Sequence, residues 1–219
     1  MDGVYNALRQ AFIERTFKLG INAIEHETPE QPIEFYREKV YLFSMMPDFA
    51  FHFKEHTEDV DTLLGIMNKM KPAYDLYGDA AYLPFDSVKD FKCLCEMGNY
   101  VLAAKLLANN ELHFVTWMYD YQRCGVLWGH YFGYDFEGVK QDFAVRAGLI
   151  DENKLFKDKE LEVLHEACLD KLLDDKNLDY DKEKSLQAII HKIEKIEPKF
   201  SELNQETVIV TETIISQEV

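Results

Sequence analysis

The chain has 219 residues, of which 47% are apolar and 13% aromatic, and its formal net charge is −16 at pH 7. This content of apolar and aromatic residues excludes a wholly disordered chain, and the negative charge disfavours direct binding to nucleic acid and anionic membranes. No run of about 18 apolar residues occurs, so the sequence predicts no membrane-spanning helix.

The first third of the chain is expected to be mainly helical. Apolar residues recur at helical spacing over 4–25, and residues 33–46 are expected to form a second helix. Residues 57–71 begin with a capping threonine and acidic residues, which predicts a third helix that ends at Pro72. Residues 48–56 alternate phenylalanine with other residues, which favours a strand, and a helix remains the alternative.

The middle of the chain combines helices with one hairpin. Two further helices are expected, one that ends at Met97 and one over 100–108. Residues 112–119 are rich in β-branched and aromatic side chains, so they predict a strand, with 126–132 as its partner. A helix over 136–147 follows.

The last third of the chain is strongly acidic. Residues 151–219 carry 10 basic and 18 acidic side chains, which is half of the excess negative charge. Segments 152–174 and 180–197 alternate charged residues with sparse aliphatic residues and are expected to be helices. The second of them carries a stripe of isoleucines that could pair with a second copy of the chain.

These patterns predict a mainly α fold of the α+β type. A helical globular domain over 1–150 is expected to contain one small antiparallel strand element near 112–132. An acidic helical extension over 151–200 follows, and 201–219 are expected to form a flexible tail or to add a strand to a partner.

A cytoplasmic location is expected for this chain. Its first twenty residues mix charged side chains into apolar positions, whereas a secretory signal has an uninterrupted apolar core. The four cysteines include no CxxC pair and do not resemble a disulfide framework, so reduced thiols are expected.

The segment His52-Phe53-Lys54-Glu55-His56 matches the pattern HxxEH. On a helix this spacing places two histidines on one zinc ion, with the glutamate as the group that activates water. The hypothesis of a zinc-dependent hydrolase, with His52 and His56 as metal ligands and Glu55 as the catalytic residue, therefore requires 48–56 to be helical.

The aromatic segment 112–136 is a candidate partner-binding face, because tryptophan, tyrosine and arginine dominate binding hot spots. Its candidate contact residues are Trp117, Tyr119, Tyr121, Arg123, Trp128, Tyr131 and Tyr134. The alternative interpretation is a core hairpin in which only the polar tips of these side chains reach the surface.

A dense group of carboxylates near the C-terminus is a candidate acidic surface for a basic partner. It consists of Asp170, Asp174, Asp175, Asp179, Asp181 and Glu183. Neighbouring lysines dilute the negative charge, so a solvated pair of charged helices explains the same pattern.

The first functional hypothesis is a non-enzymatic acidic interaction protein that needs no cofactor and binds a basic protein partner. Accessory proteins of phages and mobile elements that inhibit a nucleic-acid-binding host defence factor have this general composition. The alternatives are the zinc-dependent hydrolase and an oligomeric structural module assembled through 180–197. The sequence contains no phosphate loop, dinucleotide fingerprint or nucleophile elbow that would indicate a familiar enzyme class.

Overall fold

The computed structural model describes residues 3–26, 28, 31–175 and 178–200. The chain divides into two compact units, unit 1 (Met1–Ile150) and unit 2 (Asp151–Val219). Among the described helices, none is both long enough and apolar enough to cross a lipid bilayer.

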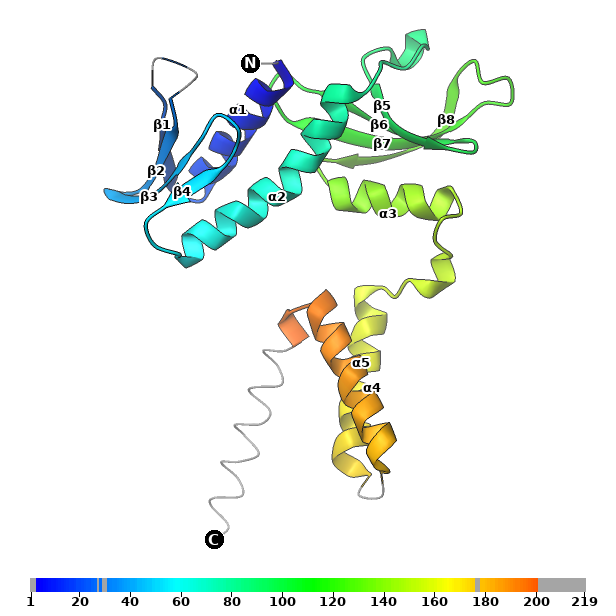
Figure 1. Cartoon of the computed structure of the whole chain (residues 1–219). Helices are drawn as coiled ribbons and strands as arrows, with labels where there is room; N and C mark the ends of the chain where they lie inside the picture. The colour runs from blue at the N-terminus through cyan, green and yellow to red at the C-terminus, as the bar shows by residue number, and fades with distance from the viewer. Residues whose placement is uncertain (1–2, 27, 29–30, 176–177, 201–219) are drawn as a thin grey trace. The chain divides into compact units, whose positions relative to one another are not determined.

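Within the described residues, unit 1 contains two four-stranded antiparallel sheets, sheet A in the order β1-β2-β3-β4 and sheet B in the order β5-β6-β7-β8 (Figure 1). The first half of unit 1 consists of α1 (Gly3–Lys18), β1 (Ile21–Ile24), β2 (Ile33–Arg37), β3 (Val40–Met45) and β4 (Phe51–Phe53). The second half consists of α2 (Glu58–Asp79), the 3-10 helix η1 (Asp86–Val88), β5 (Lys92–Met97), β6 (Tyr100–Leu106), β7 (Leu112–Tyr119), β8 (Val126–Gly133) and α3 (Phe136–Arg146).

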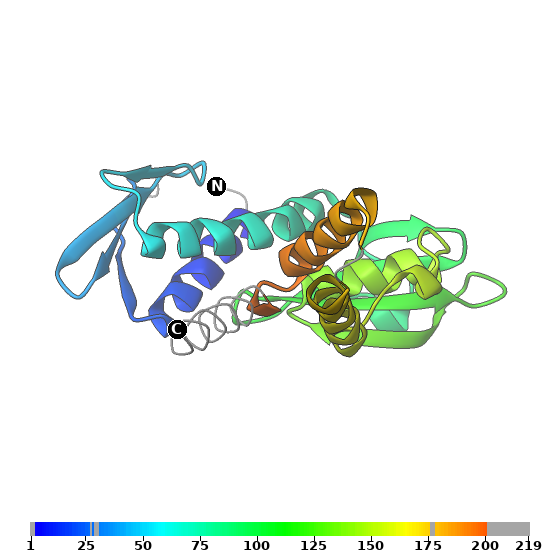
Figure 2. The same ribbon diagram turned by 90° about the horizontal axis from the view of Figure 1, so that it is seen from below.

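Stacked phenylalanines form the centre of the core at sheet A. The ring of Phe43 lies 4.5 Å from that of Phe35 and 4.4 Å from that of Phe51, so three adjacent strands contribute to one stack. Phe12 of α1 meets Phe35 edge-on at 5.6 Å. Figure 2 shows α1 and α2 side by side next to this sheet.

Helix α2 extends from sheet A to sheet B, as both ribbon views show (Figures 1 and 2). The hydroxyl of Tyr74 donates to the carbonyl oxygen of Asn110 at 2.6 Å, and the hydroxyl of Tyr77 accepts from the backbone N–H of Leu106 at 3.2 Å. The second half of α2 is therefore tied to β6 and to the turn that follows it.

Sheet B is covered on both faces. Helix α3 packs against β6, β7 and β8, and Leu102, Ala104 and Phe114 belong to the large core of unit 1. On the other face, a second core consists of Leu83, Val101, Ala103, Val115, Trp117 and Tyr119, with Phe85, Val88 and Phe91 packed against it. The central strands β6 and β7 are consequently apolar on both faces.

The prediction of a mainly α domain with one small strand element is wrong. Residues 33–46, expected to be a helix, form the β2–β3 hairpin, and the two helices expected over 86–108 are the strands β5 and β6. Helix α1 ends at Lys18, so the last residues of the helix expected over 4–25 form β1. The unit has a mixed α+β fold in which the sheets carry much of the core.

Burial on two faces explains the error at β6. The sequence of β6, YVLAAKL, is apolar from Tyr100 to Ala104 because both faces of the strand are covered there, and such a run has no period of two. The strands expected at 112–119 and 126–132 are present as β7 and β8, and the helix expected at 136–147 is present as α3. Pro72 lies inside α2 and does not end it.

Unit 2 contains the 3-10 helix η2 (Glu152–Lys154) and a hairpin of α4 (Asp158–Asp174) and α5 (Tyr180–Ile196). Its small core consists of Leu161, Ile193 and Phe200. Ile190 and Ile193 of the isoleucine stripe are buried, whereas Ile189 and Ile196 are exposed. Half of the stripe expected to pair with a second copy is thus used inside the hairpin.

A bidentate ion pair between Arg37 and Asp59 joins the end of β2 to the first turn of α2. Arg37 donates from Nε and Nη2 to the two carboxylate oxygens of Asp59, both at 2.7 Å, and these hydrogen bonds hold the pKa of Asp59 below its ordinary value. We expect Asp59→Asn to lower the free energy of unfolding at pH 7 by about 0.2–1 kcal/mol, because the pair is partly exposed.

The stabilisation from Asp59 depends on pH in a defined direction. Because its folded pKa is lowered, the contribution is complete above the unfolded pKa of about 3.9 and is lost as the pH falls below it. The free energies of unfolding of wild type and Asp59→Asn, measured with urea, should therefore differ by a constant amount from pH 7 to about pH 5 and converge as the pH falls from about 4 to about 2, with Glu58→Gln in the same helical turn as the control. A difference that stays unchanged down to about pH 2 would contradict the assignment.

Candidate functional site

Strand β8 lies at an edge of sheet B and exposes large aromatic side chains. Within the described residues it pairs with β7 alone. Trp128 and Tyr131 are 70% and 71% exposed, and Tyr121, in the turn between β7 and β8, is fully exposed. Tyr121, Trp128 and Tyr131 are called the aromatic edge. Aromatic rings used only for folding bury most of their surface, so this exposure marks a candidate binding surface.

The backbone of β8 is bulged at Trp128. The pairing of β7 with β8 shifts between Thr116 and Met118, and Trp128 has a φ of 49°. Left-handed backbone is rare for a bulky residue and costs on the order of 1–3 kcal/mol. A side chain at the next residue, Gly129, would overlap the indole of Trp117. The glycine therefore allows β8 to approach the second core while Trp128 stays exposed.

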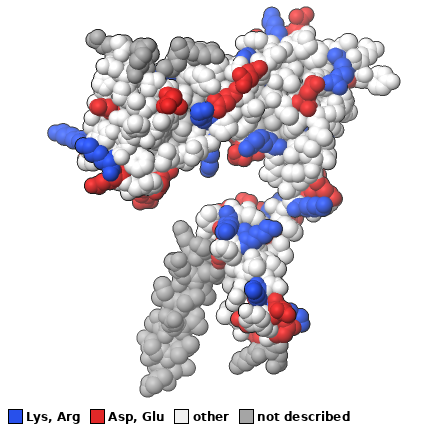
Figure 3. Space-filling model, viewed as in Figure 1, with Lys and Arg blue, Asp and Glu red and all other residues white. Residues whose placement is uncertain are grey.

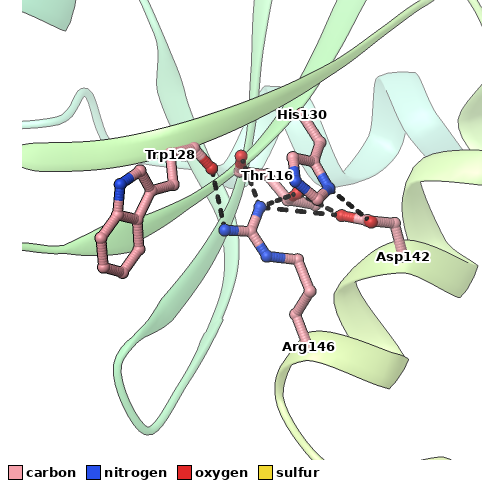
Figure 4. Close-up of polar contacts among 5 residues, drawn as sticks. All are labelled: Thr116, Trp128, His130, Asp142 and Arg146. Carbon is pink, nitrogen blue, oxygen red and sulfur yellow. Dashed lines mark hydrogen bonds and ion pairs between the residues drawn. The ribbon is translucent and has the colours of Figure 1, made fainter. Parts of the chain in front are cut away.

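A polar network on α3 holds this bulge in place (Figure 4). Arg146 donates from Nη2 to the carbonyl oxygen of Trp128 at 2.8 Å, and from Nη1 to the carbonyl oxygen and the hydroxyl of Thr116 at 3.1 and 2.8 Å. Asp142, one helical turn earlier, accepts from the Thr116 hydroxyl and contacts Nδ1 of His130 at 2.8 Å. One helix thus fixes residues on both β7 and β8.

The pairing of Asp142 with His130 resembles the way in which enzymes orient a histidine base. His130 is about half exposed, so its ring is accessible. Thr116, however, is fully buried and its hydroxyl donates to Asp142, so it is not placed as a nucleophile for His130. The contacts of the network with the backbone of β7 and β8 indicate a positioning role.

The structure separates the seven predicted contact residues. Trp117 and Tyr119 are buried in the second core, where Trp117 meets the ring of Phe91 at 4.9 Å. The exposed members are Tyr121, Arg123, Trp128, Tyr131 and Tyr134. The binding-face and core-hairpin interpretations therefore each describe a part of this segment.

Tyr119 and Arg123 are linked to β5 through Glu96. The Tyr119 hydroxyl donates to the carboxylate of Glu96 at 2.7 Å, and burial followed by this hydrogen bond raises the pKa of Tyr119. The guanidinium of Arg123 lies 4.3 Å from the centre of the Tyr119 ring and 3.5 Å from Glu96. Arg123 is therefore engaged within the hairpin, although it is exposed.

The residues of the HxxEH pattern do not form a zinc site. His52 lies on β4, and residues 54–56 are bend and coil, so the helix that the hypothesis requires is not formed. Glu55 is exposed, and Nδ1 of His56 lies 3.2 Å from Asp61. Among the described residues, no group of three His, Cys, Asp or Glu side chains is placed to hold a metal ion. The donor set does not fit zinc.

The predicted acidic surface lies at the connected ends of α4 and α5. Asp170, Asp174, Asp179, Asp181 and Glu183 are exposed and Asp175 is partly buried. Lys171 contacts Asp175 at 2.7 Å and Lys182 contacts Asp179 at 3.1 Å. Figure 3 shows basic and acidic side chains mixed at this end of the hairpin. The negative charge is therefore partly neutralised locally.

Sequence reasoning located the aromatic segment but missed Asp142 and Arg146. The available signal was their spacing of four residues on a predicted helix, which permits an ion pair, and the structure places them 3.9 Å apart. Nothing in that spacing indicates that Arg146 donates to the carbonyl oxygen of Trp128 or that Asp142 contacts the side chain of His130.

Comparisons with known proteins identify no relative. No protein-family model matches the chain, and neither a curated protein nor a solved structure matches it. Any function assigned to this chain must therefore be supported by its own geometry.

Proposed function

We propose that this chain is a protein-binding protein that contacts a basic protein partner through the aromatic edge. The observation that carries the proposal is the strained backbone of Trp128, which keeps a tryptophan exposed while Arg146 holds its carbonyl oxygen. Strain of this kind persists only where the surroundings enforce it, and it concentrates at binding and catalytic sites.

The chemistry of the aromatic edge suits a protein surface. Tryptophan and tyrosine supply a large contact area at a small cost in conformational entropy, and they are the commonest hot-spot residues. Their ring faces also attract lysine and arginine side chains, by about 0.5–2 kcal/mol for each contact. The bulge at Trp128 interrupts the edge for regular strand pairing, so recognition through side chains is favoured over addition of a strand.

The charge of the chain supports a basic partner. A net charge of −16 attracts basic surfaces and accelerates encounter with them. Proteins that bind nucleic acids carry such surfaces, and a chain bound there would block the nucleic acid. The proposal therefore includes inhibition of a nucleic-acid-binding protein, the role of some accessory proteins of phages and mobile elements. It also places the chain in the cytoplasm, where exposed thiols such as Cys95 and Cys124 stay reduced.

The test is a capture experiment from a lysate of cells that produce the protein. Three immobilised chains are compared: wild type, the double variant Trp128→Ala/Tyr131→Ala, and Phe17→Ala, which removes an equally exposed aromatic ring elsewhere in unit 1. Wild type and Phe17→Ala should retain one stoichiometric basic protein. The double variant should bind it at least about 100-fold more weakly, because two hot-spot side chains are lost.

Salt dependence provides the second part of the test. Affinity should fall as the ionic strength rises from about 0.05 to 0.5 M, because charge steering is screened over this range. The proposal fails if the double variant retains the partner as wild type does, if the captured protein is acidic, or if no stoichiometric partner is recovered.

A further inference from the structure

His130 is an accessible histidine of β8 that lies in sequence between Trp128 and Tyr131 of the aromatic edge. Its side chain is 55% exposed, and its Nδ1 lies 2.8 Å from the carboxylate of Asp142. A carboxylate at neutral pH only accepts hydrogen bonds, so Nδ1 of the neutral imidazole is the donor and Nε2 carries the lone pair. Nε2 has no hydrogen-bond partner among the described residues. The network on α3 therefore leaves His130 with one unused acceptor.

Among the described residues, the charged groups that face His130 come from α3 and offset each other. Asp142 supplies a negative charge and Arg146 a positive one, 3.9 Å apart. Their side chains are only 19% and 12% exposed, so the accessible titratable group is His130. Its paired residue on β7 is the uncharged Thr116, and the sequence of β8 contains no Asp, Glu, Lys or Arg. The protonation state of His130 therefore sets the charge of β8.

Arginine is the side chain of a basic partner that suits β8 best. A guanidinium is planar, stacks on the face of an indole and keeps its N–H groups free for hydrogen bonds in its own plane. Trp128 offers an exposed indole, and His130 offers an acceptor two residues further along the same strand. A segment with several arginines that follows β8 can therefore use both.

We propose that an arginine-rich segment of the partner binds along β8 by stacking on Trp128 and donating to Nε2 of neutral His130, so that protonation of His130 releases the partner. This inference rests on the proposed function and adds its regulation. The charge of histidine ordinarily changes between pH 5 and 8. Protonation removes the acceptor at Nε2 and places a positive charge beside the guanidinium groups, and both changes weaken binding.

The test measures binding of tetra-arginine, with both ends blocked, to the full chain at pH 7.5 and at pH 5.5. The charge of this probe is the same at both values, because arginine stays protonated. Two-dimensional NMR follows the indole N–H of Trp128, which is assigned from its absence in Trp128→Phe. Wild type should bind the probe about tenfold more weakly at pH 5.5 than at pH 7.5.

His130→Asn should abolish this pH dependence. The amide of asparagine can still donate toward Asp142, but it lacks Nε2 and gains no proton in this range. The affinities of the variant at the two pH values should therefore differ by less than about twofold.

His56→Asn is the matched control. His56 is also more than half exposed and its Nδ1 lies 3.2 Å from Asp61, but it lies between β4 and α2. This variant should keep the pH dependence of wild type. The inference is overturned if tetra-arginine does not shift the Trp128 signal at pH 7.5, if wild type binds it equally at both pH values, or if His130→Asn retains the wild-type ratio.

The captured partner separates failure of this inference from failure of the proposed function. A stoichiometric basic partner that wild type retains equally at pH 7.5 and pH 5.5 would remove the regulation by His130 and leave the proposed function in place. Failure to capture a partner at either pH would remove the proposed function and this inference with it.

Discussion

Trp117→Ala is expected to lower the free energy of unfolding by about 3–5 kcal/mol, the usual cost of truncating a buried aromatic side chain to alanine. Trp117 is 4% exposed and lies in the second core between the rings of Phe91 and Tyr131, at 4.9 and 6.1 Å. Its indole also fills the space next to Gly129, where a Cβ atom on residue 129 would overlap it. Its loss leaves a cavity on the face of sheet B opposite α3.

The chain contains its own control for this prediction, because its second tryptophan lies on the surface. Trp128→Ala should change the free energy of unfolding by no more than about 0.5 kcal/mol, since an exposed side chain contributes little to the fold. Urea unfolding followed by far-UV circular dichroism measures both variants. If Trp117→Ala and Trp128→Ala lowered the free energy of unfolding equally, Trp128 would be a residue that stabilises the fold. The aromatic edge would then no longer be a candidate binding surface.

Arg146→Met is expected to lower the free energy of unfolding by about 2–4 kcal/mol, because it leaves the carbonyl oxygen of buried Thr116 and that of Trp128 without their donor. The side chain of Arg146 is 12% exposed, and its guanidinium donates to the carbonyl oxygens of Trp128 and Thr116. Arg146→Lys should recover only part of this loss of stability. A single ammonium group does not reproduce the planar guanidinium, whose two terminal nitrogens donate to β7 and to β8 at the same time. Lys140→Met on the exposed face of α3 is the control, with a change within about 0.5 kcal/mol.

The same substitution has a second, independent readout. In a Trp117→Phe background, fluorescence reports Trp128 alone, and Arg146→Met should shift its emission because the bulge relaxes. Partner affinity should fall in Arg146→Met by more than the folded fraction explains. An unchanged emission maximum together with unchanged affinity would reduce Arg146 to a stabilising residue with no role in presenting Trp128.

Strand content was underestimated for reasons that particular segments make clear. In β2, buried Ile33 and Phe35 alternate with partly exposed residues, but 33–46 also has apolar residues at helical spacings, and the tight turn at Glu38 carries no glycine or proline as a signal. In β6, burial on both faces removes the alternation altogether. Where one periodicity or one cap dominates, as at Thr57 before α2 and Asp135 before α3, the expected helix starts agree with the structure.

By itself, the sequence determined the acidity of this chain, its aromatic middle, the β7–β8 hairpin and the charged helices near its C-terminus. Each of these follows from composition or from a short-range period. Tertiary structure decided which aromatic residues are buried and which are exposed. Trp117 and Trp128 are the same residue type on paired strands, and only the cover over one face of sheet B and the bulge held by Arg146 make one a core residue and the other a surface residue. Burial depends on contacts between segments distant in sequence, and no local pattern encodes them.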